Sequence, residues 1–92
     1  MLNMNAIKQL INIELYKLSP TEKNTLLNAI FHLMSDVEID DFWKERISKK
    51  GKSLERYVFD GVVSFMKNKD YTVNELWNHE DDCEIFDYIH AI

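Results

Sequence analysis

The sequence predicts an all-α fold, a compact bundle of about five to six short helices in a single helical domain of residues 1–92. Three observations predict it. A Ser or Thr is followed three positions later by Glu at residues 19–22, 35–38 and 72–75, which is the capping-box pattern of a helix start. Apolar residues recur at helical spacing along most of the chain. Only two Gly and one Pro are present, too few to mark a linker between domains.

The first expected helix covers residues 5–18, because apolar side chains fall on one face of that segment. They are Ile7, Leu10, Ile11, Leu15 and Leu18. Ser19 caps the next helix and Pro20 occupies its first position, where a missing N–H removes no hydrogen bond. The apolar arc of this second helix consists of Leu26, Leu27, Ile30, Phe31, Leu33 and Met34, with Asn24, Asn28 and His32 on the opposite side. The short connection predicts antiparallel neighbours.

A third helix is expected to begin near Ser35 or Asp36 and to end within residues 48–51. Its inward residues are Ile39, Phe42, Trp43 and Ile47. Two lysines near its end complement the negative end of the helix dipole. Gly51 is suited to the left-handed conformation that commonly follows a helix.

The fourth helix is expected over about residues 54–67, with Ser53 as its cap. Apolar side chains cover most of its circumference and leave only a narrow polar stripe, which predicts that other elements cover it on most sides. We therefore expect this helix to be the centre of the fold. Gly61 in its middle costs about 1 kcal/mol relative to Ala. Such a glycine suggests that another helix crosses close to it.

Two further helices complete the bundle. Residues 68–71 are expected to form a turn, after which Thr72 begins a short helix that contains Val73, Leu76 and Trp77. The last helix is expected from about residue 81 to the end of the chain. Its apolar side consists of Ile85, Phe86, Tyr88, Ile89 and Ile92.

The charges are distributed unevenly along a chain whose net charge is −5. The segment Lys44–Arg56 holds six cations, whereas residues 70–92 hold seven carboxylates and no Lys or Arg. Together with Trp77, an aromatic side chain suited to anchor an interface, these carboxylates form the predicted partner-binding site. Its members are Asp70, Glu75, Trp77, Glu80, Asp81, Asp82, Glu84 and Asp87. The alternative is that the same charges only complement helix dipoles and keep the protein in solution.

No residues are predicted to be catalytic, and neither a metal nor another cofactor is expected. His79, Cys83, Asp87 and His90 would share one face of the last helix, but one straight helix can direct only about two such neighbours at a single ion. The carboxylates at 36–40 resemble the start of a calcium loop. That loop is rejected because Asp41 stands where Gly is needed and Ile47 where a bidentate Glu is needed.

Two charged residues fall where the helical pattern predicts burial, Glu14 on the first helix and Arg46 on the third. An internal pair would satisfy both, because a lone buried charge is costly. The preferred alternative is that one or both extend to solvent at the edge of the core.

Size, negative charge and the absence of recognisable chemistry predict that the protein is not an enzyme. We expect a small acidic protein-binding module that inhibits or neutralises a basic, nucleic-acid-handling partner such as a nuclease or toxin. An immunity protein, an antitoxin or a phage-encoded antagonist would act in this way. One alternative is a nucleic-acid-binding regulator that uses the segment Lys44–Arg56, although the sequence pI of about 5.1 argues against nucleic acid. A helical homo-oligomer subunit is another.

The location expected from the sequence is the cytoplasm. The N-terminus lacks the basic region and unbroken apolar run of a secretory signal. No segment approaches the 18 or so consecutive apolar residues of a membrane span. The lone Cys83 fits a reducing compartment.

Overall fold

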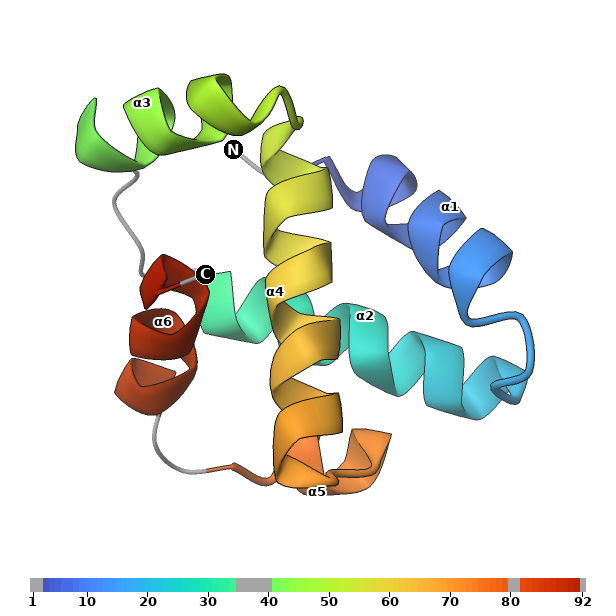
Figure 1. The fold of residues 1–92 in the computed structure, drawn as a ribbon. Helices are drawn as coiled ribbons and strands as arrows, with labels where there is room; N and C mark the ends of the chain where they lie inside the picture. The colour runs from blue at the N-terminus through green and yellow to red at the C-terminus, as the bar shows by residue number, and fades with distance from the viewer. Residues whose placement is uncertain (1–2, 35–40, 80–81, 92) are drawn as a thin grey trace.

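A computed structural model describes residues 3–34, 41–79 and 82–91, and within these ranges the chain forms six helices and no strand (Figure 1). The helices are α1 (Met4–Glu14), α2 (Pro20–Met34), α3 (Asp41–Lys50), α4 (Leu54–Lys69), α5 (Val73–Trp77) and α6 (Asp82–Ala91). The predicted all-α bundle is therefore confirmed.

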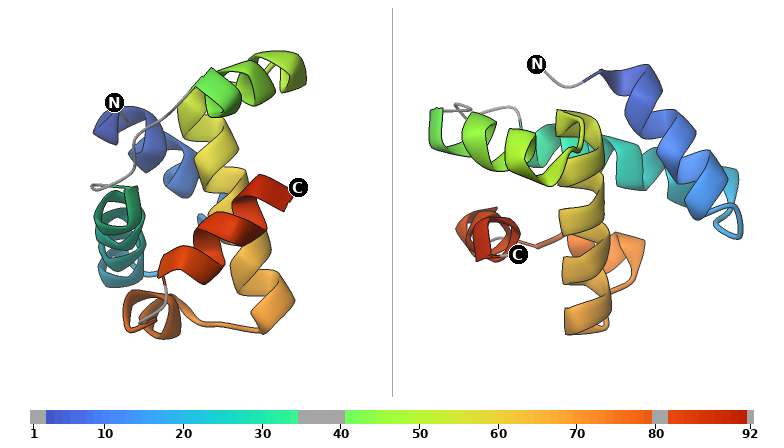
Figure 2. Two further views of the ribbon diagram at one scale, coloured as in Figure 1. Left: turned by 90° about the vertical axis from the view of Figure 1, so that its left-hand side faces the viewer. Right: turned by 45° about the horizontal axis from the view of Figure 1, so that its top comes forward.

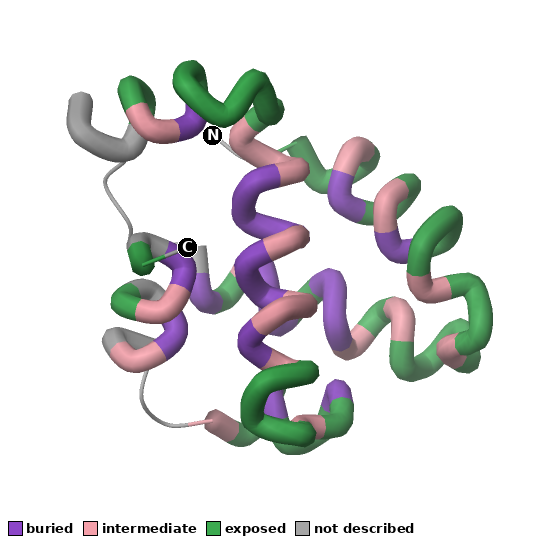
Figure 3. Tube along the Cα trace, viewed as in Figure 1, coloured by how far each residue is buried: buried purple, intermediate pink, exposed green. Residues whose placement is uncertain are grey.

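Helix α4 is the centre of the bundle, as its nearly continuous apolar surface predicts. Helices α1, α2 and α6 all contact it, and α5 packs on α2 (Figures 1 and 2). Buried positions follow α4 along most of its length (Figure 3). The largest side chains that are less than 2% exposed are Phe65, Ile7, Ile11, Leu26, Ile30, Leu76, Ile85, Ile89, Val58 and Val62.

Two of the three predicted capping boxes are present. The Ser19 hydroxyl accepts the N–H of Glu22 at 3.1 Å, and the Glu22 carboxylate accepts the N–H of Ser19 at 3.0 Å. Thr72 and Glu75 make the same reciprocal pair at the start of α5, at 3.3 Å each. The third pattern, residues 35–38, lies outside the described residues. These side chains satisfy backbone donors that a helix start leaves free.

The prediction that the first helix extends to residue 18 is wrong. Helix α1 begins after the cap Asn3 and ends at Glu14, and Leu15 has non-helical backbone angles. Residues 15–18 form the turn that leads to the Ser19 cap, in which the N–H of Leu18 donates to the carbonyl of Leu15 at 3.1 Å. Leu15 and Leu18 still pack against the core from the turn between the helices. Helices α1 and α2 are in contact, as the tight connection predicts.

Helix α3 lies beside the upper end of α4 and extends away from the bundle (Figures 1 and 2). It begins at Asp41, whereas the predicted start at Ser35 or Asp36 falls outside the described residues. Ile47 anchors it to the core at 9% exposure. The predicted left-handed cap is confirmed: Gly51 has a φ of 64°, and its N–H donates to the carbonyl of Ser48 at 3.1 Å.

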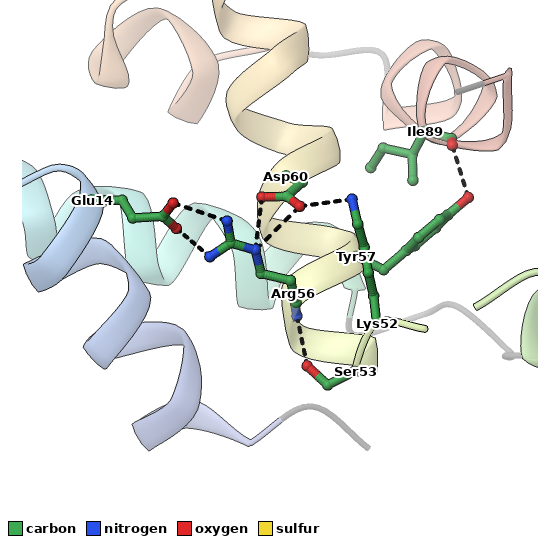
Figure 4. A network of polar contacts seen from close by, with 7 residues as sticks. All are labelled: Glu14, Lys52, Ser53, Arg56, Tyr57, Asp60 and Ile89. Atoms are coloured by element: carbon green, nitrogen blue, oxygen red, sulfur yellow. Dashed lines mark hydrogen bonds and ion pairs between the residues drawn. The ribbon is translucent and has the colours of Figure 1, made fainter. Parts of the chain in front are cut away.

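Helix α6 crosses α4 at Gly61, where the sequence predicts a close approach. A Cβ placed on Gly61 would lie 2.7 Å from Cγ1 of Ile89, so only glycine fits without a shift of one helix. Beside this point the buried Tyr57 hydroxyl donates to the carbonyl of Ile89 at 3.0 Å (Figure 4). That carbonyl lies in the last turn of α6, where helix carbonyls have no intrahelical donor. A hydrogen bond between the hydroxyls of Ser64 and Tyr88, at 3.0 Å, adds a further contact between the helices.

Candidate functional site

The predicted acidic residues lie on the C-terminal end of α4, on α5 and on α6. The end of α4, α5 and the start of α6 are located at the same end of the molecule (Figure 1). Asp70 follows α4, Glu75 is on α5, and Glu84 and Asp87 are on α6. The side chains of Glu80, Asp81 and Asp82 lie outside the described residues. We use the name acidic face for the members of this predicted set that the structure shows to be exposed, Asp70, Glu75, Trp77 and Asp87, which come from three separate elements.

The carboxylates of the acidic face have no ion-pair partner among the residues that the structure describes. Asp70, Glu75 and Asp87 are exposed, and no Lys or Arg of the described ranges makes an ion pair with them. Glu84 differs, because it pairs with Lys69 at 3.0 Å. Its hydrogen bond and negative charge raise the pKa of Lys69 above the ordinary lysine value. Glu84 therefore holds α6 to the end of α4 and contributes no free charge to the face.

Trp77 provides the acidic face with an exposed aromatic ring. The helix α5 buries Val73 and Leu76, at 4% and 2% exposure, and leaves Trp77 47% exposed at its C-terminal end. The Trp77 ring lies against His32 of α2, with ring centroids 6.0 Å apart. This contact restricts the indole on one side. A partly held, half-exposed tryptophan has the properties of an interface anchor.

The aspartate at position 70 does not stabilise the C-terminal end of α4. Asp70 has a φ of 56°, a left-handed conformation that Gly adopts without strain and that Asp and Asn tolerate less readily than Gly. Its N–H and that of Tyr71 close the helix end by donating to carbonyls of the last turn. A negative charge at this position also opposes the negative end of the helix dipole. Both effects would favour Gly or Asn here.

The basic segment Lys44–Arg56 uses much of its charge within the fold. The Arg56 guanidinium donates to both carboxylate oxygens of Glu14, which joins the end of α1 to α4 (Figure 4). Its Nε and the ammonium of Lys52 both reach the carboxylate of Asp60, at 3.2 and 2.9 Å. The bond to Glu14 raises the pKa of Arg56, and the charge of Asp60 contributes to this shift. Arg56 is therefore a structural cation.

Other cations of the segment are also engaged. Lys49 pairs with Glu45 one helical turn away at 3.2 Å, and the ammonium of Lys50 lies over the ring of Tyr57, 5.7 Å from its centroid. A surface that binds phosphates needs cations that can exchange solvent counterions for phosphate contacts. The internal partners of this segment therefore weigh against the nucleic-acid alternative.

The structure revises the predicted environment of Glu14. The Glu14 side chain is 37% exposed because α1 ends at this residue, so the predicted burial is wrong. Exposure at the edge of the core agrees with the preferred alternative. Its partner is Arg56 and not Arg46. Sequence spacing could not identify this partner, because the two residues are 42 positions apart and meet only when α1 packs on α4.

Two kinds of feature are not found among the described residues. In the ranges that the structure describes, no group of three or more His, Cys, Asp or Glu side chains is arranged to hold a metal ion. Among the same residues, no helix combines the length and apolar character needed to span a bilayer. The side chains of Cys83 and His90 from the predicted polar face of α6 are outside the description.

Comparison of the chain with protein-family models, with curated proteins and with solved structures found no match.

Proposed function

We propose that this protein is a small acidic binding module that occupies and inhibits a basic, nucleic-acid-handling partner. A nuclease or toxin would be such a partner, and the protein would act as an immunity protein, an antitoxin or a phage-encoded antagonist does. The observation that carries the proposal is the difference in charge pairing between two parts of the chain. Lys49, Lys52 and Arg56 of the segment Lys44–Arg56 form ion pairs within the fold. In contrast, Asp70, Glu75 and Asp87 are exposed without an ion-pair partner among the described residues.

Unpaired surface carboxylates act at a distance as well as on contact. Proteins that handle nucleic acid expose cationic grooves, and an anionic surface increases the rate at which it meets such a groove. Coulomb attraction of this kind is screened within about 8–10 Å at physiological ionic strength. The proposed complex should therefore form more slowly as salt is added.

Attraction between opposite charges increases the association rate and orients the two partners. High affinity also requires a side chain that is buried in the interface away from water. Trp77 is suited to that role because it is 47% exposed and lies on α5, the short helix that also carries Glu75. An indole entering an apolar depression of the partner would exclude water from the surrounding ion pairs. The charges alone would then account for the rate of association and Trp77 for the lifetime of the complex.

The experiment is capture of a partner from extracts of the source cell, followed by measurements with the purified pair. We expect a basic protein whose association rate falls with increasing salt and whose nucleic-acid activity decreases when the acidic protein is added. Asp70→Asn with Asp87→Asn should slow association, and Trp77→Ala should speed dissociation about tenfold or more. Asn suits the backbone at position 70, so this loss would not reflect unfolding.

Matched control variants distinguish binding through the acidic face from an effect of the protein's total negative charge. Glu45→Gln with Glu55→Gln removes the same charge from α3 and the start of α4, and Tyr16→Ala removes another aromatic ring that is 66% exposed. Both controls should bind as the unmodified protein does. Capture of no basic protein, or binding that ignores salt and the variants of the acidic face, would refute the proposal.

A further inference from the structure

A groove between α1 and α2 has properties opposite to those of the acidic face. Its volume is about 360 Å³. Ile11 and Leu27 form its floor, and both belong to the buried core at 1% and 8% exposure. The polar walls are provided by Lys8 and Asn12 from α1 and by Lys23 and Asn24 from α2.

The two lysines of this groove are not used by the fold. Neither Lys8 nor Lys23 makes an ion pair within the described ranges, and no carboxylate lines the groove. Two ammonium groups beside one depression repel each other, and a bound anion would relieve that repulsion. A cationic groove free of carboxylates is notable in a chain with a net charge of −5.

We propose that the α1–α2 groove binds a small anionic ligand with an apolar body. The acid group, a carboxylate or a phosphate monoester, lies between Lys8 and Lys23. The apolar body covers Ile11 and Leu27. Asn12 and Asn24 each bring an amide N–H₂ to the wall, which can donate to the acid oxygens. This inference does not depend on the proposed function.

The composition of the groove sets the class and size of the ligand. Ligand sites are largely apolar with a few placed polar groups, and their volumes run from about 300 to 1,000 Å³. The groove, at about 360 Å³, is at the small end of that range. A fully solvated anion would gain little from exposed lysines alone. The contact between the ligand's apolar body and the apolar floor would therefore supply the additional binding free energy that makes the affinity measurable.

The test is an NMR titration of the complete ¹⁵N-labelled protein with five probes. Octanoate and octyl phosphate carry both features, acetate and inorganic phosphate carry only the charge, and 1-octanol carries only the chain. We expect octanoate or octyl phosphate at low-millimolar concentration to shift the side-chain amide signals of Asn12 and Asn24. The stronger of the two identifies the acid group. The remaining probes should bind at least about tenfold more weakly.

Variants with the same loss of charge make the test specific. Lys8→Gln with Lys23→Gln should weaken the binding of the stronger probe about tenfold. Lys44→Gln with Lys67→Gln removes two exposed lysines from α3 and α4 and should leave binding unchanged. Circular dichroism would verify that both proteins are folded. The proposal fails if neither amphiphile shifts the Asn signals, if octanol binds equally well, or if the two double variants behave alike.

Discussion

Replacing Gly61 with Ala tests the packing of α6 on α4, the contact that positions the acidic residues of α6. Two effects of opposite sign compete. Alanine favours a helix interior by about 1 kcal/mol over glycine. However, the new Cβ would lie 2.7, 3.1 and 3.3 Å from Cγ1, Cγ2 and Cβ of Ile89. Contacts between carbon atoms are favourable at about 3.5–4.0 Å, so one helix must move.

The magnitude follows from which atoms are too close. They belong to the branched base of Ile89 and not to its flexible end, so a rotamer change cannot relieve all three contacts. Overpacking of this kind costs about 1–3 kcal/mol. Separating the helices would also stretch the hydrogen bond from Tyr57 to the carbonyl of Ile89. After subtracting the gain of about 1 kcal/mol in helix propensity, we expect Gly61→Ala to lower the free energy of unfolding by up to about 2 kcal/mol.

Urea unfolding followed by far-UV circular dichroism measures this difference. With an m-value of about 1 kcal/mol/M, the midpoint should fall by up to roughly 2 M. In an Ile89→Ala background the clash is largely removed, so Gly61→Ala should be neutral or stabilising there. Gly51→Ala is the control, because its strain is in the backbone and its cost should add to that of Ile89→Ala. A more stable Gly61→Ala protein, or additivity with Ile89→Ala, would refute the packing argument.

Three further predictions concern other parts of the bundle. Tyr57→Phe leaves the buried carbonyl of Ile89 without its hydrogen-bond donor and should lower the free energy of unfolding in urea by about 1–2 kcal/mol. An unchanged midpoint would mean that another donor reaches this carbonyl. Asp70→Asn and Asp70→Gly should each raise the free energy of unfolding by about 0.5–1 kcal/mol, because both relieve backbone strain and an unfavourable helix-end charge; a lower melting temperature would contradict this. Glu14→Gln and Arg56→Gln should couple by no more than about 1 kcal/mol, since both side chains are more than a third exposed, and the coupling should weaken in high salt. Coupling of Glu14 to Arg46 of similar size would instead restore the pair that the helical pattern suggested.

Local chemistry accounts for the part of the fold that the sequence predicts well. The capping residues Ser19, Ser53 and Thr72 bond to backbone groups within a few positions, so sequence spacing alone locates those helix starts. Gly61 is informative for a related reason. A glycine in a helix otherwise rich in apolar side chains is explained by a neighbour that leaves no room for a Cβ.

Contacts between distant segments account for the part that the sequence predicts badly. The length of α1 depends on how the chain must turn before Pro20, and the partner of Glu14 depends on how α1 packs on α4. Pairing likewise determines which charges remain free. Composition places Glu84 with the other carboxylates, but only the packing of α6 brings it to Lys69.

The α1–α2 groove carries lysines and the acidic face carries carboxylates, and this difference has a consequence for both proposals. Lys8 and Lys23 line the α1–α2 groove and have no ion-pair partner among the described residues, whereas the carboxylates of the acidic face lie at the end of α4, on α5 and on α6. The molecule extends 36 × 26 × 22 Å, several times the screening length of about 8 Å in physiological salt. Long-range attraction between these surfaces is therefore weak in that medium. Neutralising Asp70 and Asp87 should leave octanoate binding unchanged, and neutralising Lys8 and Lys23 should leave partner capture unchanged. A loss of both activities in either variant would mean that the two surfaces meet the same ligand, which the charges on this fold do not favour.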